Sequence, residues 1–95
     1  MDFQIRFTEG ALADFEEILA YSWANFPTGA EQFGNAILNH IELLRRFPYI
    51  GCRVMGRPGV RQLVHTPILI YYRVNHSPNY VEILHLQHGS HESAR

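Results

Sequence analysis

The sequence predicts a small α+β fold in which one strand and two helices precede three antiparallel strands. Three observations support it: an alternating stretch at the N-terminus, two stretches with helical periodicity, and three strand-like runs joined by short turns. With 95 residues the chain has room for one domain, which we expect to span residues 1–95. Hydrophobic residues make up 46% and aromatic residues 13%, which provides for a core and argues against disorder.

The first strand is predicted at residues 3–7, where apolar and polar side chains alternate with a period of two. Thr8 is a suitable N-cap for a helix, and Glu9 lies favourably in its first turn. Apolar side chains then recur at helical spacing, at Leu12, Phe15, Leu19, Trp23 and Phe26. We expect Pro27 to end this first helix.

A second helix is predicted to follow almost at once. Thr28 and Glu31 have the spacing of a capping box, in which a threonine precedes a glutamate by three residues. One apolar face continues through Phe33, Ile37, Ile41 and Leu44, and the helix should stop before Pro48. The break between the two helices is short, so they should form an antiparallel αα-hairpin.

Residues 48–59 contain three glycines and two prolines, and we predict a loop there. Three strands should follow, from Val60 to His65, from Ile68 to Val74 and from Tyr80 to His88. The middle run is almost continuously apolar and aromatic, which favours a central position in the sheet. Short turns imply antiparallel neighbours, so the predicted order is β-α-α-β-β-β.

Charge is divided unevenly along the chain, although the net charge is only −1. Residues 1–42 carry seven acidic residues and one arginine, whereas residues 43–95 carry seven arginines and two glutamates. The sequence contains no lysine, and five of its six histidines lie in the basic half. A GC-rich genome, which favours arginine codons, would explain the missing lysines but not the separation of acidic and basic residues along the chain. Arginine differs from lysine in binding phosphates and carboxylates bidentately.

The sequence favours a cytoplasmic protein. It shows no secretion signal at its start and no apolar run of the roughly 20 residues that span a bilayer. Cys52 is the only cysteine, which excludes an internal disulfide and fits a reducing compartment. His85, His88 and His91 suggest a metal site only weakly, because a structural zinc site needs four ligands at close spacing. We expect neither a metal nor another cofactor.

Five short motifs occur in order: Thr8 to Ala11, Leu44 to Gly51 with Phe47-Pro48 inside it, Gly59 to Leu63, Ile70 to Val74, and Val81 to Gly89. In this order and spacing they resemble the RelE/ParE toxin superfamily, and most closely its ParE-like branch of plasmid stabilisation proteins. The resemblance covers nearly the whole chain. It implies a helical hairpin on a small antiparallel sheet, and a toxin that a cognate antitoxin wraps and neutralises in a hetero-oligomeric complex.

The resemblance leaves the target open between two branches. RelE-like members cut mRNA on the ribosome, and in them the position of Arg61 helps to stabilise phosphate charge. A nuclease would use Arg61, Arg73, His88 and His91. ParE-like members are understood to poison DNA gyrase without a known catalytic centre. A degenerate, non-toxic member that acts only in an antitoxin complex is a third reading.

Departures from the family pattern argue against a nuclease. The lysines of RelE-like members have no counterpart, Ser90 and His91 follow the last histidine where arginines are common, and His85 replaces another frequent arginine. We therefore favour a toxin that acts by binding a protein, DNA gyrase, over a toxin that cleaves mRNA. The expected partners are an antitoxin and this target, with no membrane.

Arg53, Arg57 and Arg61 are the candidate binding residues of the basic half. Arg53 and Arg57 lie in the predicted loop, where binding residues are common, although solvated loop charges would need no function. Arg61 would, in the plain reading, pair with Glu82 or face water. On the helices, Tyr21, Trp23 and Phe26 are candidates for an antitoxin groove, although core packing is the expected use of Trp23.

Overall fold

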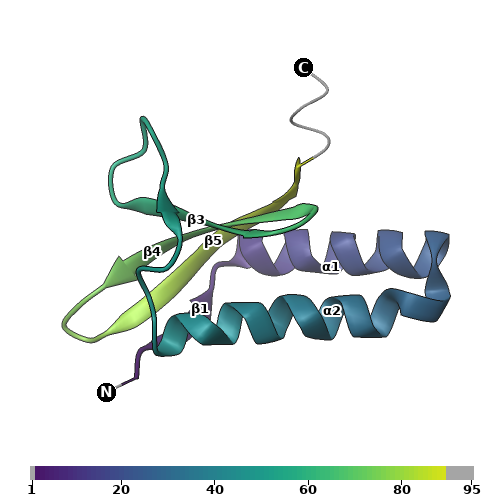
Figure 1. The fold of residues 1–95 in the computed structure, drawn as a ribbon, viewed down its shortest axis with the longest axis horizontal. Coiled ribbons are helices and arrows are strands. Elements are labelled where there is room, and N and C mark those ends of the chain that lie inside the picture. The colour runs from purple at the N-terminus through teal and green to yellow at the C-terminus, as the bar shows by residue number, and fades with distance from the viewer. Residues whose placement is uncertain (1, 90–95) are drawn as a thin grey trace.

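A computed structural model describes residues 2–89 of the chain (Figure 1). A hairpin of two long helices lies against one face of a twisted sheet, as the sequence predicts. The elements are β1 (Gln4–Phe7), α1 (Glu9–Asn25), α2 (Pro27–Glu42), the 3-10 turn η1 (Leu43–Arg45), β2 (Cys52–Arg53), β3 (Val60–His65), β4 (Ile68–Asn75) and β5 (Tyr80–His88). Within residues 2–89, no helix is long and apolar enough to cross a bilayer.

The five strands form one sheet in the order β1-β5-β4-β3-β2, so β4 occupies the predicted central place. The last four strands pair antiparallel with their neighbours, whereas β1 pairs parallel with β5. The prediction of a loop over residues 48–59 is confirmed except at two residues. Cys52 and Arg53 form the short strand β2 opposite Gln62 and Arg61, a pairing too brief to leave a periodic signal.

Thr8 caps α1, as predicted, and ties the helix to the sheet. Its Oγ1 accepts a hydrogen bond from the Ala11 N–H at 3.0 Å and donates to the Leu84 carbonyl at 2.9 Å. One helical turn later, the Asp14 carboxylate accepts the Leu86 N–H at 3.0 Å. These bonds fix α1 along β5.

The apolar stripe predicted for α1 matches its buried face only in part, at Phe15 and at half-buried Leu19. Ala11 and Ser22 are buried, with Phe15 and Ile18 packed on the core between them. Leu12, Trp23 and Phe26 are 49%, 53% and 47% exposed, so the expectation that Trp23 packs in the core is wrong. The buried residues and the predicted stripe both recur at helical spacing. The side of α1 that carries small residues faces inward because α2 and β5 lie close to it.

The predicted capping box at the start of α2 is also wrong. Thr28 lies inside the helix, which begins at Pro27, and no side chain caps it. Proline suits the first position of a helix because its missing N–H would have no helical partner there. Phe26 therefore ends α1 and begins α2 at once.

The core lies between the helical hairpin and the sheet. Ile37, Ile41 and Leu44 are buried, as predicted for the second helix. They pack against the inner side chains of the strands, which are Leu63, Ile68, Ile70, Tyr72, Val81, Ile83 and Leu86. The register opposite Tyr71 and Tyr72 skips Leu84 on β5, which is a β-bulge. Beyond it, His85 and His88 point to opposite faces, as strand alternation predicts.

Two half-buried histidines connect α2 to the end of β3. The Nδ1 atoms of His40 and His65 lie 2.9 Å apart, and the Phe33 ring packs 6.3 Å from His65. Only one of the two nitrogens can carry the shared proton, since two donors cannot bond. Burial, and then the charge on His40, lower the pKa of His65 below its usual value.

This pair predicts that the protein loses stability in acid. A lowered pKa means that folded His65 binds fewer protons than unfolded His65, whose pKa is about 6.5. The free energy of unfolding is therefore unaffected well above pH 6.5 and falls as the pH drops below it. The Tm should fall between pH 7.5 and 5.5 by less in His65→Gln than in the wild type. Equal falls in the two proteins would contradict a lowered pKa at His65.

Candidate functional site

The loop that follows η1 is anchored by a buried tyrosine of β4. Tyr72 is fully buried, and its Oη accepts the Gly51 N–H at 2.9 Å. A Cβ at Gly51 would lie 2.6 Å from this oxygen and 2.7 Å from the Gln62 carbonyl oxygen, so only glycine fits. Burial raises the pKa of Tyr72, and the bond from Gly51 offsets this only in part. The phenol therefore stays neutral and anchors the loop.

Arg61 is held by the same loop. Its Nη1 donates to the carbonyl oxygens of Gly51 at 2.8 Å and Tyr49 at 3.3 Å, and its guanidinium lies 4.9 Å from the centre of the Tyr49 ring. The expected ion pair between Arg61 and Glu82 does not form, because Glu82 lies opposite Arg73 in the sheet. Among residues 2–89 the hydrogen bonds of the Arg61 guanidinium come from Nη1, which leaves its Nε and Nη2 donors for a ligand.

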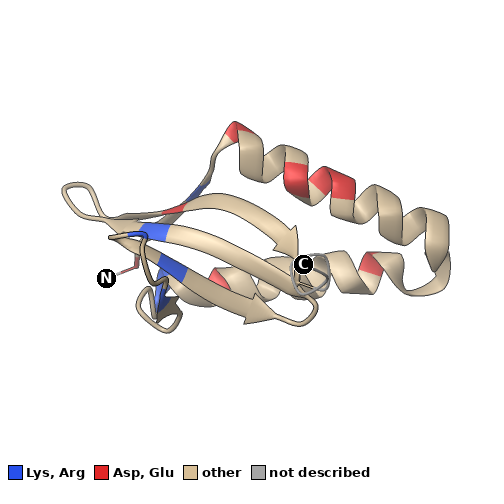
Figure 2. Ribbon diagram, turned by 90° about the horizontal axis from the view of Figure 1, so that it is seen from above, with Lys and Arg blue, Asp and Glu red and all other residues tan. Residues whose placement is uncertain are grey.

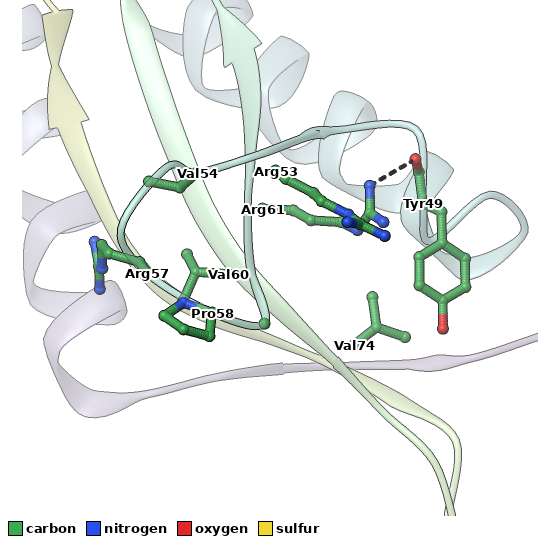
Figure 3. A pocket seen from close by; sticks show the side chains of 9 residues that line it. Tyr49, Arg53, Val54, Arg57, Pro58, Val60, Arg61 and Val74 are labelled. Carbon is green, nitrogen blue, oxygen red and sulfur yellow. Dashed lines mark hydrogen bonds between the residues drawn. The ribbon is translucent and has the colours of Figure 1, made fainter.

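The three candidate arginines surround one hollow of about 410 Å³ (Figure 3). Arg53 lies opposite Arg61 in the β2–β3 register, and Arg57 comes from the turn beyond β2. The other lining residues are Tyr49, Val54, Pro58, Gly59, Val60 and Val74. Over residues 2–89, the ion pair that forms is Arg45–Glu42, so no carboxylate neutralises the three arginines. Such a hollow attracts carboxylates or phosphates.

Arg57 also reaches the face of the sheet that points away from the helices. Its guanidinium lies 5.6 Å from the centre of the Tyr71 ring, and its Nη1 lies 3.4 Å from His85 Nε2. Tyr71 and His85 stack with ring centres 4.5 Å apart, and Gln62 donates to the Tyr71 hydroxyl at 2.9 Å. The sequence did not indicate this cluster, because it depends on the register of the three strands and on where the loop places Arg57.

Of the four residues proposed for a nuclease, the three that the structure describes do not meet in one place. Arg61 shares the inner face with Tyr72, its cross-strand partner, whereas Arg73 is the next residue of β4 and points outward. His88 pairs with Ile68, at the far end of β4 from Arg61. His91 lies outside the described residues. Between residues 2 and 89, no group of three or more histidine, cysteine or acidic side chains has the geometry to hold a metal ion.

The aromatic candidates gather at the tip of the helical hairpin, which projects past the sheet (Figure 1). Tyr21, Trp23 and Phe26 are each about half exposed, at 58%, 53% and 47%. Tyr21 packs edge-on against Phe26 at 6.3 Å, and Phe26 against Phe33 at 6.5 Å. Tyr21 and Phe26 thus form an apolar patch with Phe33 at this tip, and Trp23 is a further exposed aromatic residue at the same end of α1.

The charge division of the sequence is also a division in space. Figure 2 shows the acidic residues mainly along the helices, while arginines gather at one end of the sheet. The hollow lies at this basic end, beside the first residues of β3.

Comparisons with known proteins agree with this architecture. The profile of one protein family, the ParE toxin of type II toxin-antitoxin system, parDE, matches residues 5–92. A solved structure of the chromosomal ParDE system from P. aeruginosa is similar, with a TM-score of 0.78 and 23% identity over 90% of this chain and 95% of that one. The RelBE2 toxin-antitoxin complex from Mycobacterium tuberculosis gives 0.70 and 20% over 93% and 92%. A search of curated proteins gave no match.

The helical hairpin on a five-stranded sheet is therefore the RelE/ParE toxin fold. The family match covers almost the full length and includes the loop that builds the hollow. The chain belongs to the ParE toxin family of type II toxin–antitoxin systems.

The contact between Gly51 and Tyr72 predicts that Gly51→Ala destabilises the protein. The added methyl group overlaps the Tyr72 hydroxyl and the Gln62 carbonyl, and such overpacking costs about 1–3 kcal/mol. Urea unfolding measures this loss. Gly29→Ala is the matched control, because nothing lies within 4 Å of a Cβ in that part of α2, and alanine favours a helix by up to about 1 kcal/mol. An equally stable Gly51→Ala protein would contradict the prediction.

Proposed function

We propose that this ParE-family toxin acts by binding a protein target, DNA gyrase, rather than by cutting RNA, and that a cognate antitoxin neutralises it. The observation that carries the proposal is the arrangement of the arginines. Arg53, Arg57 and Arg61 meet around one hollow, whereas Arg61 and Arg73 lie on opposite faces of the sheet and His88 lies at the far end of β4 from Arg61.

The hollow is suited to acidic side chains of a partner protein. Three guanidinium groups without carboxylate partners of their own give a positive potential that attracts acidic groups and steers their approach. Bidentate bonds from arginine to carboxylate then add geometric selectivity. We propose that the target presents its acidic residues here.

The hairpin tip is the proposed contact for the antitoxin. Exposed Tyr21, Trp23 and Phe26 offer the apolar surface that an amphipathic helix needs, with aromatic side chains as anchors. The two similar structures are themselves of toxin–antitoxin systems. The complex would be a hetero-oligomer of toxin and antitoxin.

Expression of the chain alone, and then with the product of the neighbouring upstream gene, tests the proposal. We expect growth arrest with a DNA-damage response, relieved by the neighbour, and inhibition of purified DNA gyrase. Transcript cleavage in a translating extract would instead support the RelE-like nuclease. Tight binding to the neighbour without any toxicity would support the degenerate member.

Arginine variants test the binding surface. Arg61→Ala should weaken gyrase inhibition by about tenfold or more, because a central arginine anchor is worth at least about 1–2 kcal/mol. Arg6→Ala removes the same charge from β1, at the opposite edge of the sheet, and should leave inhibition unchanged. Equal effects of the two variants would indicate general charge attraction and contradict a defined site.

A further inference from the structure

The turn between β4 and β5 reaches the arginine hollow through a chain of three side chains. Asn79 Oδ1 lies 3.1 Å from His76 Nδ1, and His76 Nε2 lies 2.7 Å from the Tyr49 hydroxyl. Tyr49 lines the hollow and contacts Arg61. Residues far apart in the sequence are therefore connected to the guanidinium of Arg61.

The hydrogen bonds of this chain have one consistent direction. The Asn79 side-chain oxygen can only accept, so His76 Nδ1 carries the proton. The Nε2 of a neutral imidazole is then an acceptor, and the Tyr49 hydroxyl donates to it. Phe3 packs edge-on against the His76 ring at 5.6 Å and limits its rotation. His76 is thus fixed in both its tautomer and its orientation.

Tyr49 transmits this order to Arg61 by two contacts. Its carbonyl oxygen accepts from Arg61 Nη1, and its ring lies 4.9 Å below the guanidinium. The Tyr49 side chain is about half exposed, at 52%, so packing alone does not fix its ring. The bond to His76 holds it in place.

We infer that His76 is a positioning residue for the hollow: through Tyr49 it directs the free Nε and Nη2 edge of Arg61 to receive a carboxylate of a protein partner. This inference rests on the proposed binding function of the arginines. An arginine that is already ordered loses less side-chain entropy when it binds. A bidentate pair with a carboxylate also needs the plane of the guanidinium to be set.

The test is the affinity of the purified chain for DNA gyrase at fixed ionic strength. His76→Ala should weaken binding by about 3- to 10-fold, which corresponds to the loss of one hydrogen bond of about 0.5–1.5 kcal/mol. Tyr49→Phe should have a similar effect, since it removes the other partner of the same bond. Both side chains are exposed, and an unchanged Tm for each variant would show that the fold is intact.

Two further variants separate positioning from a general structural effect. His76→Gln places an amide oxygen where Nε2 lies and can accept from Tyr49, so it should restore most of the affinity. In the double variant His76→Ala/Tyr49→Phe the losses should not add, because both changes break one contact. Failure of His76→Gln to restore binding, or additive losses, would overturn the inference.

Arg61→Ala distinguishes this inference from the function on which it rests. If Arg61→Ala weakens gyrase binding while His76→Ala does not, the inference is wrong and the proposed site stands. If Arg61→Ala has no effect, the hollow is not the binding site and both fail. Asn79→Ala should give a smaller loss than His76→Ala, because Nε2 can still accept from Tyr49 when His76 keeps its tautomer.

Discussion

The bond from the Gly51 N–H to the buried Tyr72 hydroxyl is the constraint on which the basic end of the molecule depends. It joins the middle strand of the sheet to the loop that carries Tyr49, β2 and the hollow. Because Tyr72 is neutral and fully buried, its hydroxyl needs a hydrogen-bond partner, and the loop backbone provides one. The Gly51 carbonyl then accepts from Arg61, so the same residue anchors the loop and orients the arginine.

Strand alternation decides which arginines can act together. Arg61 and Arg73 are both strand residues with the same charge, but the β3–β4 register places them on opposite faces. Arg53 joins Arg61 only because the short strand β2 pairs opposite it. Two like charges side by side are unfavourable unless an anion shares them. The cost of this pairing is consistent with a surface that is completed by an acidic partner.

Much of the fold could be predicted from the sequence, since periodicity and turn residues are local signals. The three C-terminal strands, the cap at Thr8 and the inner face of α2 follow from such signals. The inner face of α1 could be predicted only in part, at Phe15, because two neighbouring apolar stripes compete and the buried one also contains small residues. Ala11 and Ser22 are inside because α2 and β5 approach closely, which depends on tertiary packing.

The candidate site divides in the same way. Arginines in a glycine-rich loop could be identified from composition, but their meeting in one hollow depends on β2, whose two residues give no periodic signal. In the sequence, His76 belongs to a predicted turn and Tyr49 to a predicted loop. No spacing indicates that Asn79, His76 and Tyr49 form a chain of hydrogen bonds, because 27 residues separate Tyr49 from His76. Long-range hydrogen bonds of this kind follow from topology alone.

The loop around β2, which lines the hollow, and the tip of the helical hairpin lie at opposite ends of a molecule whose longest dimension is 41 Å (Figure 1). An α-helix rises 1.5 Å per residue, so a helix of about 12 residues covers less than half of this length. One short helix on Tyr21, Trp23 and Phe26 would therefore leave Arg61 accessible. An antitoxin that covers both surfaces needs a further segment, and an extended chain spans about 3.3 Å per residue. A partner that holds the tip and also closes the hollow therefore needs two binding segments and not one.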